Sequence, residues 1–201
     1  SNSRTTEVIT PLPVNTTTFS LLVMNATGCE FRTNQRIVPA VTPPIGGAPQ
    51  TICLGSNTQI GSALNPTGGG ITYVWSSSKP ANLSLLSSTS NPNPTFTPVS
   101  AGEYIFTLTK IQDGCESPVD VIVRVNSFEL PTIASPSICE GTSVQIGSAP
   151  QSGVQYFWSP TTGLSDPMIA NPIVSGLTQT TNYRLDAIGP NGCPTNATVI
   201  V

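Results

Sequence analysis

The sequence predicts an all-β protein built from tandem, antiparallel two-sheet sandwiches. Three observations support this class: a long internal repeat, short segments in which apolar and polar residues alternate, and almost no helical patterning. Alternation puts successive side chains on opposite faces of a strand, as a half-buried sheet requires. The 201 residues include 20 Pro and 17 Gly. These recur too often for a helical apolar period to last three turns.

The first half of the repeat occurs twice. The segment ICLGSNTQIGSA, which starts at Ile52, returns as ICEGTSVQIGSA from Ile138 without insertion or deletion. Each copy is followed by an alternating segment, ITYVWSS in one and VQYFWSP in the other. Both alternating segments are predicted strands whose Tyr and Trp side chains face the same way.

The second half of the repeat occurs three times, as TTTFSLLVMNATGCEF, AGEYIFTLTKIQDGCES and TTNYRLDAIGPNGCPT. Each copy runs from an aromatic residue through a strand to Gly-Cys. The dipeptides Thr27-Gly28, Asp113-Gly114 and Asn191-Gly192 suit a tight hairpin turn. A β-branched residue follows each Cys at the same spacing, and we expect it to end the last strand: Ile37, Val123 and Val201.

These repeats divide the chain into two complete units and part of a third. Residues 42–127 and 128–201 are each predicted to form one sandwich of about seven short strands. Residues 1–41 hold only the second half of a unit, so other strands must complete it. Pro-rich segments between the units are expected to act as short, stiff spacers. The chain starts without Met, and we expect it to be a segment of a longer protein.

The core of each sandwich is predicted from the inward positions of the strands. Phe19, Trp75, Tyr104, Trp158 and Tyr183 are the principal candidates. The wider set also includes Ile60, Tyr73, Phe106, Leu108, Val121, Val123, Ile146, Tyr156, Leu185, Val199 and Val201.

The five cysteines indicate disulfides rather than a metal site, because the chain has no His and no C-x-x-C pair. We predict the bridges Cys53–Cys115 and Cys139–Cys193, each stapling one end of a sandwich. The chain-entropy model gives each bridge about 4 kcal/mol of stabilisation. Cys29 is then unpaired within this segment. Its partner is expected earlier in a longer polypeptide or in another copy of the chain.

The last unit resembles a known family in the run WSPTTGLSDPMIANP, which is followed by TTNYRL and NGC. These residues are similar to the immunoglobulin-like (Ig-like) or PKD-like repeats of very large surface proteins of gliding and other Bacteroidota-type bacteria. The resemblance covers both full units and the leading half, although the middle unit lacks the Gly-Leu-Ser-Asp-Pro run. It implies type IX export to the cell surface and a role as a stalk or adhesin, including gliding adhesins.

Composition and motifs argue against several functions. Charged residues make up 8% of the chain and the net charge is −3, so no basic surface for nucleic acid is expected. No apolar run is long enough to insert into a membrane. Without His, the usual base of a nucleophilic site is missing, and we expect neither an enzyme nor a cofactor. Asp113 and Asp166 are assigned to turns, although a single calcium ion at a domain joint is left open.

The leading functional hypothesis is therefore a non-enzymatic stalk or adhesin segment on the bacterial cell surface. Its partners would be neighbouring Ig-like repeats of the same polypeptide, or an adjacent subunit that covers residues 1–41. One alternative is a filament subunit in which strands of another chain complete residues 1–41. Another is a module that binds a surface glycan through exposed aromatic residues, for which Trp75 and Trp158 are the weak candidates.

Overall fold

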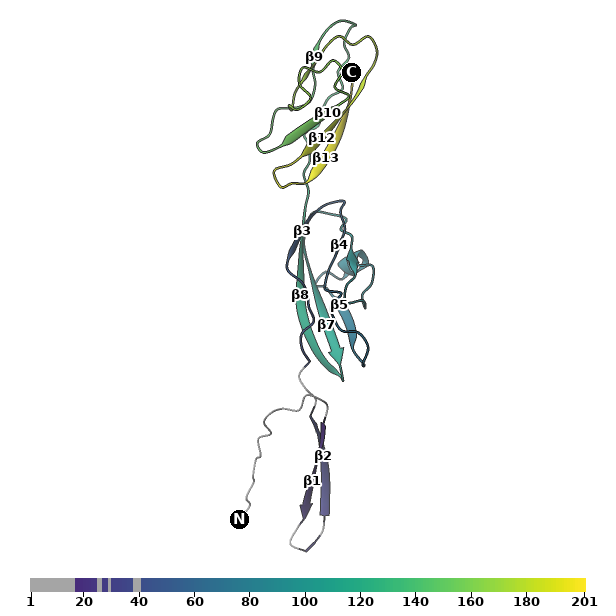
Figure 1. Cartoon of the computed structure of the whole chain (residues 1–201), viewed down its shortest axis with the longest axis vertical. Helices are drawn as coiled ribbons and strands as arrows, with labels where there is room; N and C mark the ends of the chain where they lie inside the picture. Colours follow the sequence, from purple (N-terminus) through teal and green to yellow (C-terminus); the bar gives the residue numbers. More distant parts are fainter. Residues whose placement is uncertain (1–16, 25–26, 29, 38–40) are drawn as a thin grey trace.

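The computed structural model describes residues 17–24, 27–28, 30–37 and 41–201. Within these residues the chain forms a two-stranded hairpin followed by two β-sandwiches. Figure 1 shows the hairpin, the first sandwich and the second sandwich following one another along the long axis of the molecule. The all-β class with tandem Ig-like sandwiches is confirmed.

The N-terminal hairpin pairs β1 (Thr17–Met24) with β2 (Glu30–Ile37) in an antiparallel ladder. Cross-strand pairing places Phe19, Leu21, Val23 and Phe31 on one face, because Leu21 is opposite Thr33 and Val23 is opposite Phe31. These apolar side chains are exposed, and Phe19 keeps 38% of its surface. Nothing in the described structure covers this face, and the placement of Phe19 in a core completed from outside this segment stays a prediction.

The first sandwich contains two sheets and a short 3₁₀ helix. Its strands are β3 (Gln50–Cys53), β4 (Thr58–Gln59), β5 (Thr72–Ser76), β6 (Thr95–Phe96), β7 (Gly102–Gln112) and β8 (Cys115–Asn126). One sheet has the order β3-β8-β7-β5 and the other pairs β4 with β6. The edge strand β3 runs parallel to β8, and all other pairs are antiparallel. This arrangement is typical of Ig-like domains.

The helix η1 (Pro80–Leu85) occupies the loop in which the first unit departs from the second. It starts at Pro80, whose fixed φ and missing N–H suit the first helical position. The two sandwiches therefore differ in this connection, as the divergent sequence of the loop indicated.

The second sandwich repeats the plan with shorter strands. They are β9 (Val144–Gln145), β10 (Gln155–Ser159), β11 (Ile173–Val174), β12 (Asn182–Ile188) and β13 (Pro194–Ile200). One sheet has the order β10-β12-β13 and the other pairs β9 with β11. Strands β5 and β10 show the same alternation of exposed and buried residues, so the Tyr and Trp of each point into the core.

The two long hairpins differ in their turns. Strands β7 and β8 are joined by the two residues Asp113 and Gly114, which both have positive φ, as a type I′ turn requires. Strands β12 and β13 are joined by residues 189–193, because Ile188 is opposite Pro194. The expectation that Val123 ends its strand is wrong, because β8 continues to Asn126, whereas β2 ends at Ile37 and β13 ends one residue before Val201. Tyr104 is opposite Val123, whereas Tyr183 is opposite Val199.

Candidate functional site: the joint between the two sandwiches

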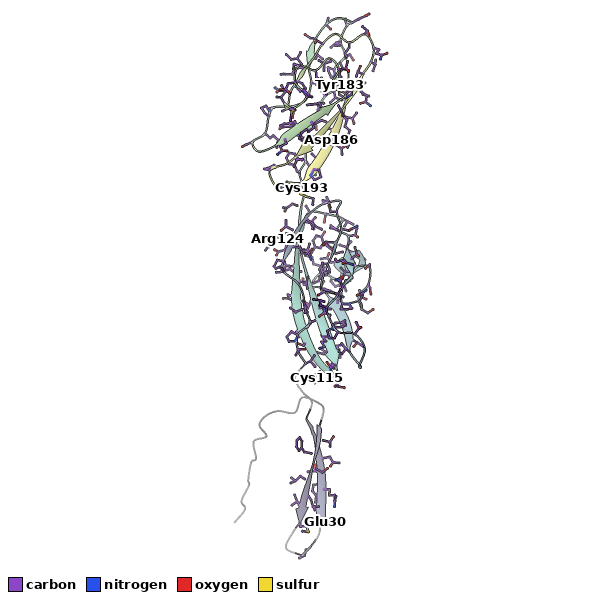
Figure 2. The ribbon with its side chains drawn as sticks, in the orientation of Figure 1. Glu30, Cys115, Arg124, Tyr183, Asp186 and Cys193 are labelled. Carbon is purple, nitrogen blue, oxygen red and sulfur yellow. A yellow bond between two sulfur atoms is a disulfide. The ribbon has the colours of Figure 1, made fainter. Side chains whose placement is uncertain are left out.

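A disulfide bond joins the two sandwiches. Cys53 is the last residue of β3 in the first sandwich, and Cys193 directly precedes β13 in the second. Their Cα atoms are 5.4 Å apart although 140 positions separate them in sequence. In Figure 2 Cys193 lies at the boundary between the sandwiches, while Cys115 lies at the opposite end of the first. The predicted bridges Cys53–Cys115 and Cys139–Cys193 are therefore wrong.

Strand direction explains why Cys53 cannot pair within its own sandwich. The parallel pairing of β3 with β8 places Cys53 opposite Asn126, the last residue of β8. Cys115 is the first residue of that strand, which has 12 residues. At about 3.3 Å per residue, the strand separates the two cysteines by about 35 Å. A disulfide requires Cα atoms within about 7 Å. Cys53 and Cys115, which lie at opposite ends of β8, are therefore too far apart to be bonded.

The same geometry separates Cys139 from Cys193. Cys139 lines a small hollow together with Val201, at the end of the sandwich where β13 finishes. Cys193 lies just before β13 begins, and the 7 residues of that strand span roughly 20 Å.

Cys139 and Cys115 are free thiols, Cys139 exposed and Cys115 half-buried. The expectation that Cys29 is unpaired falls on a residue outside the described part of the chain.

The hairpin end of the second sandwich also makes noncovalent contacts across the joint. The side-chain amide of Asn191 donates a 2.9 Å hydrogen bond to the carbonyl oxygen of Ser127. The Oδ1 atom of Asn191 accepts a 3.1 Å bond from the N–H of Cys193, which fixes the turn that carries the cysteine. The Sγ atom of Cys193 lies 3.7 Å from the carbonyl oxygen of Asn126. These contacts fix the hairpin against the end of β8.

Phe128 supports the hairpin from the linker side. A Cβ atom at Gly189 would overlap the ring of Phe128, so only glycine allows the hairpin to approach this closely. Phe128 also packs against the core of the second sandwich, together with Leu130 and Ile133. The Oγ atom of Ser135 accepts a 3.0 Å hydrogen bond from the N–H of Ile200 in β13. The Pro-rich linker, expected to be a short, stiff spacer, is therefore also docked on the second sandwich.

The chain entering the first sandwich is held in a similar way. The buried Asn65 makes two hydrogen bonds to the backbone of Ile45, accepting one of 2.7 Å and donating one of 3.0 Å. The buried Lys110 donates a 3.3 Å bond from Nζ to the Thr42 hydroxyl. Both side chains tie the segment before β3 to the sandwich. Neither residue was identified from the sequence, because an isolated Asn or Lys carries no pattern.

The predicted core residues lie in two separate clusters. Trp75 and Tyr104 are buried in the first sandwich, and Trp158 and Tyr183 in the second. The Nε1 atom of Trp75 donates to the carbonyl oxygen of Asn91 at 2.7 Å, and that of Trp158 to Ile169 at 2.9 Å. Both indoles are thus enclosed by protein and are unable to stack on a sugar ring. The wider set of core candidates in the two sandwiches is buried as well, except Val201, which is half-buried.

Charged groups form no reactive cluster within the described residues. No group of three or more His, Cys, Asp or Glu is placed to hold a metal ion there. The Oδ1 atom of Asp166 accepts a 2.8 Å hydrogen bond from the N–H of Met168, which confirms its assignment to a turn. The exposed Arg184 is hydrogen-bonded to Asp186 through Nε and Nη2, which raises the pKa of the guanidinium. No helix in the described part of the chain is long and apolar enough to span a membrane.

Comparison with known proteins gives only distant structural similarity. No protein-family model matches the chain, and no curated protein matches it in sequence. Among solved structures it is similar to a SusE-like, surface-located polysaccharide-binding protein from the heparin utilisation locus of Bacteroides thetaiotaomicron, with a TM-score of 0.41 and 10% identity. That alignment covers 92% of this chain and 43% of the other, so this chain spans less than half of that protein.

Two further structures are similar at the same level. The I-band fragment I67–I69 of titin gives a TM-score of 0.39 and 9% identity, over 92% of this chain and 73% of that fragment. The extracellular cadherin domains 1–4 of protocadherin gamma B7 give a TM-score of 0.34 and 15% identity, over 94% of this chain and 64% of the other. These similarities assign no function to the chain.

Proposed function

We propose that this chain is a non-enzymatic stalk segment of a large bacterial cell-surface adhesin, and that its sandwiches carry tension along the molecule. The resemblance of its repeats to those of gliding bacteria favours a gliding adhesin exported by the type IX route. Disulfide bonds persist in oxidising environments outside the cytosol, which supports a location on the cell surface.

The observation that carries this proposal is the bond between Cys53 and Cys193. It closes the first sandwich from the end of β3 onward, the linker, and the second sandwich up to the start of β13 into one covalent loop. Tension that reaches Cys53 passes through the sulfur atoms to Cys193. It therefore bypasses the chain between them, which holds every buried core residue of the two sandwiches except Val199. A stalk built in this way keeps its length even when one of its sandwiches unfolds.

Single-molecule force spectroscopy of the full chain, pulled from its two ends, tests this load path. Without reductant, the chain between Cys53 and Cys193 should contribute no extension. With a thiol reductant, unfolding should release up to roughly 460–500 Å, since 140 residues extend by about 3.3–3.6 Å each.

The Cys53→Ser variant should release the same length without reductant. A matched Cys139→Ser variant should behave like the unmodified chain, because Cys139 is outside the bond. Release of the full length from the oxidised, unmodified chain would show that tension does not pass through this bridge, and the proposal would fail.

A filament subunit is the second candidate, because the N-terminal hairpin exposes an apolar face. Phe19, Leu21 and Val23 occupy the positions that correspond to Tyr183, Leu185 and Ala187, which are buried in the second sandwich. We propose that β1 and β2 belong to a third sandwich whose other strands come from outside the described residues. Strands from another copy of the chain would generate a polymer.

Sedimentation and electron microscopy of the full chain separate these two candidates. A helical polymer that is lost in a Leu21→Lys variant, but kept in a matched Ser20→Lys control of the same charge on the opposite face, would favour the filament. Monomers at all concentrations would favour the stalk. The two tryptophans do not support glycan binding, since both are buried.

A further inference from the structure

The free Cys139 occupies in the second sandwich the place that the bonded Cys53 occupies in the first. Each is the Cys of an Ile-Cys-x-Gly segment, and the two copies of this segment align without a gap. The carbonyl oxygen of Cys53 accepts a 3.0 Å hydrogen bond from the N–H of Ser56, and that of Cys139 accepts a 3.1 Å bond from Thr142. Gly55 and Gly141 both have positive φ, at 91° and 77°. The two cysteines thus present their side chains from the same local turn.

The free Cys115 corresponds in the same way to the bonded Cys193. Each cysteine follows the turn glycine of a long hairpin, Gly114 in one and Gly192 in the other. Each hairpin lies at the end of its sandwich opposite to the Ile-Cys turn. Each sandwich therefore carries two cysteines, one at each end, and one of the two is already bonded.

We propose that Cys139 and Cys115 are the two open halves of further joints of the kind formed by Cys53 and Cys193. Cys139 bonds to the hairpin cysteine of a sandwich that follows, and Cys115 bonds to the Ile-Cys turn of a sandwich that precedes. The partner at both ends is another repeat of this type. The inference rests on the same kind of joint as the proposed function. Its test, however, measures which cysteines are bonded and does not measure force.

The surface around Cys139 suits this role. The exposed thiol borders a hollow of about 190 Å³ whose wall includes Leu177 and Val201. Val201 exchanges two backbone hydrogen bonds with Thr181, of 2.8 and 3.0 Å, and so corresponds to Val125, which is opposite Gly102. In the formed joint, the residue after Val125 is Asn126, which faces Cys193. The hollow thus lies where the second sandwich would receive the next hairpin.

This pairing rule makes the bridges overlap. The bond from Cys53 ends at Cys193, while the bond from Cys139 would begin before that point in the sequence. In the same way, the bond that ends at Cys115 would close a loop that includes Cys53. Every peptide bond within an array of such repeats would therefore lie inside at least one disulfide loop. A single cut by a protease would not separate the stalk into two pieces.

Each new bond requires a two-electron oxidant. The thiols of Cys139 and of the hairpin cysteine lose two protons and two electrons and form one S–S bond. A small disulfide such as oxidised glutathione accepts them, and its own S–S bond breaks to give two thiols.

Two extended forms of the full chain test the pairing. In the first, a copy of residues 126–201 is appended directly after Val201, which continues the chain at the position corresponding to Asn126. In the second, a copy of residues 128–201 replaces residues 1–37, so that a complete sandwich precedes residue 38. Both are refolded with a glutathione redox buffer, alkylated, and mapped by non-reducing proteolysis and mass spectrometry.

In the first form Cys139 should lose its reactivity to iodoacetamide and appear in a peptide linked to the copied Cys193. In the second form Cys115 should be linked to the copied Cys139. The original bond between Cys53 and Cys193 should remain in both. A Cys139→Ser substitution in the first form should leave the copied Cys193 alkylated, which excludes mispairing with Cys115 or Cys29.

Folding of each added sandwich is monitored as a third unfolding transition. The proposal is overturned if the added sandwich folds but the thiol still reacts with iodoacetamide. That thiol is Cys139 in the first form and Cys115 in the second. If one extended form does not fold, the other form decides the result. In the unextended chain, a Cys139–Cys115 bond between two copies would support the same pairing and identify a second chain as the source of the next repeat.

Discussion

The two sandwiches share one strand plan but fill their cores differently. The first core holds an aromatic cluster in which Phe96 and Phe106 have ring centroids 5.3 Å apart, and Trp75 and Phe106 have centroids 6.3 Å apart. The second core has Val174 in the place of Phe96 and Leu185 in the place of Phe106. The second sandwich thus has less apolar volume of its own, and the linker residues Phe128, Leu130 and Ile133 add to its core.

This difference shows how stability is shared along the chain. The first sandwich has longer strands and an aromatic core, so most of its stabilisation is internal. The second sandwich depends more on the linker and on the joint, because these cover part of its core. We therefore expect the second sandwich to unfold first in denaturant, and the substitutions below to change the gap between the two transitions.

Removing the central indole should have the largest effect. Trp158→Ala should lower the free energy of unfolding of the second sandwich by about 3–5 kcal/mol, through lost apolar burial and the cavity that remains. That loss should unfold this sandwich in native buffer while the first stays folded. Amide exchange of the full chain, compared between Trp158→Ala and Trp75→Ala, measures this. Equal persistence of both sandwiches in the two variants would contradict the ranking.

Replacing Phe106 tests whether the aromatic cluster accounts for the difference. Phe106→Leu gives the first core the residue that the second has at this place, and it should cost the first sandwich about 1–2 kcal/mol. The two transitions in urea should then move closer together. The control is Ile105→Leu on the exposed face of the same strand, which should change little. An unchanged gap in Phe106→Leu would show that the cluster is not the cause.

Breaking the joint should widen the range of orientations between the two sandwiches. Without the bond between Cys53 and Cys193, the linker and the hydrogen bond of Asn191 still connect them, but less rigidly. Small-angle X-ray scattering should show a wider range of interdomain angles in Cys53→Ser than in the Cys139→Ser control. Equal ranges in the two variants would contradict the interdomain role.

Alkaline pH should weaken both sandwiches slightly. Burial raises the pKa of Tyr73 in the first sandwich and of Tyr183 in the second above 10.0. The folded chain then holds these phenol protons more tightly than the unfolded chain does. Their contribution is complete below pH 10 and is lost as pH rises above it.

Urea midpoints near pH 9 and pH 11 measure this effect, in a background with Cys29→Ser, Cys115→Ser and Cys139→Ser that avoids thiol exchange. Tyr73→Phe should reduce the pH dependence of the first transition alone, and Tyr183→Phe that of the second. Midpoints that rise with pH would contradict the assigned direction.

Much of the fold could be predicted from the sequence, because alternation and repetition are local signals. The matching strands with Trp75 and Trp158 identify both cores, and the Gly-Cys segments identify the hairpins. The bridges could not be predicted in this way. Sequence order does not reveal that β3 runs parallel to β8, which is what carries Cys53 to the far end of its sandwich. The assumption that each unit closes on itself led to the wrong pairs.

The contacts of the joint were hidden for a related reason. Asn191 was recognised as a turn residue, but the partner of its side chain is in the other sandwich. Phe128 is an aromatic residue directly before a Pro-rich linker that contains no other aromatic residue. That isolated aromatic residue was the available signal of a docked linker.

The central claim is that consecutive sandwiches are covalently joined through Cys53 and Cys193. Proteolysis of the non-reduced, alkylated full chain followed by mass spectrometry tests it directly. The structure predicts one linked peptide pair that contains Cys53 and Cys193, with Cys115 and Cys139 alkylated. Linked pairs of Cys53 with Cys115 and of Cys139 with Cys193 would contradict it, since each sandwich would then close on itself.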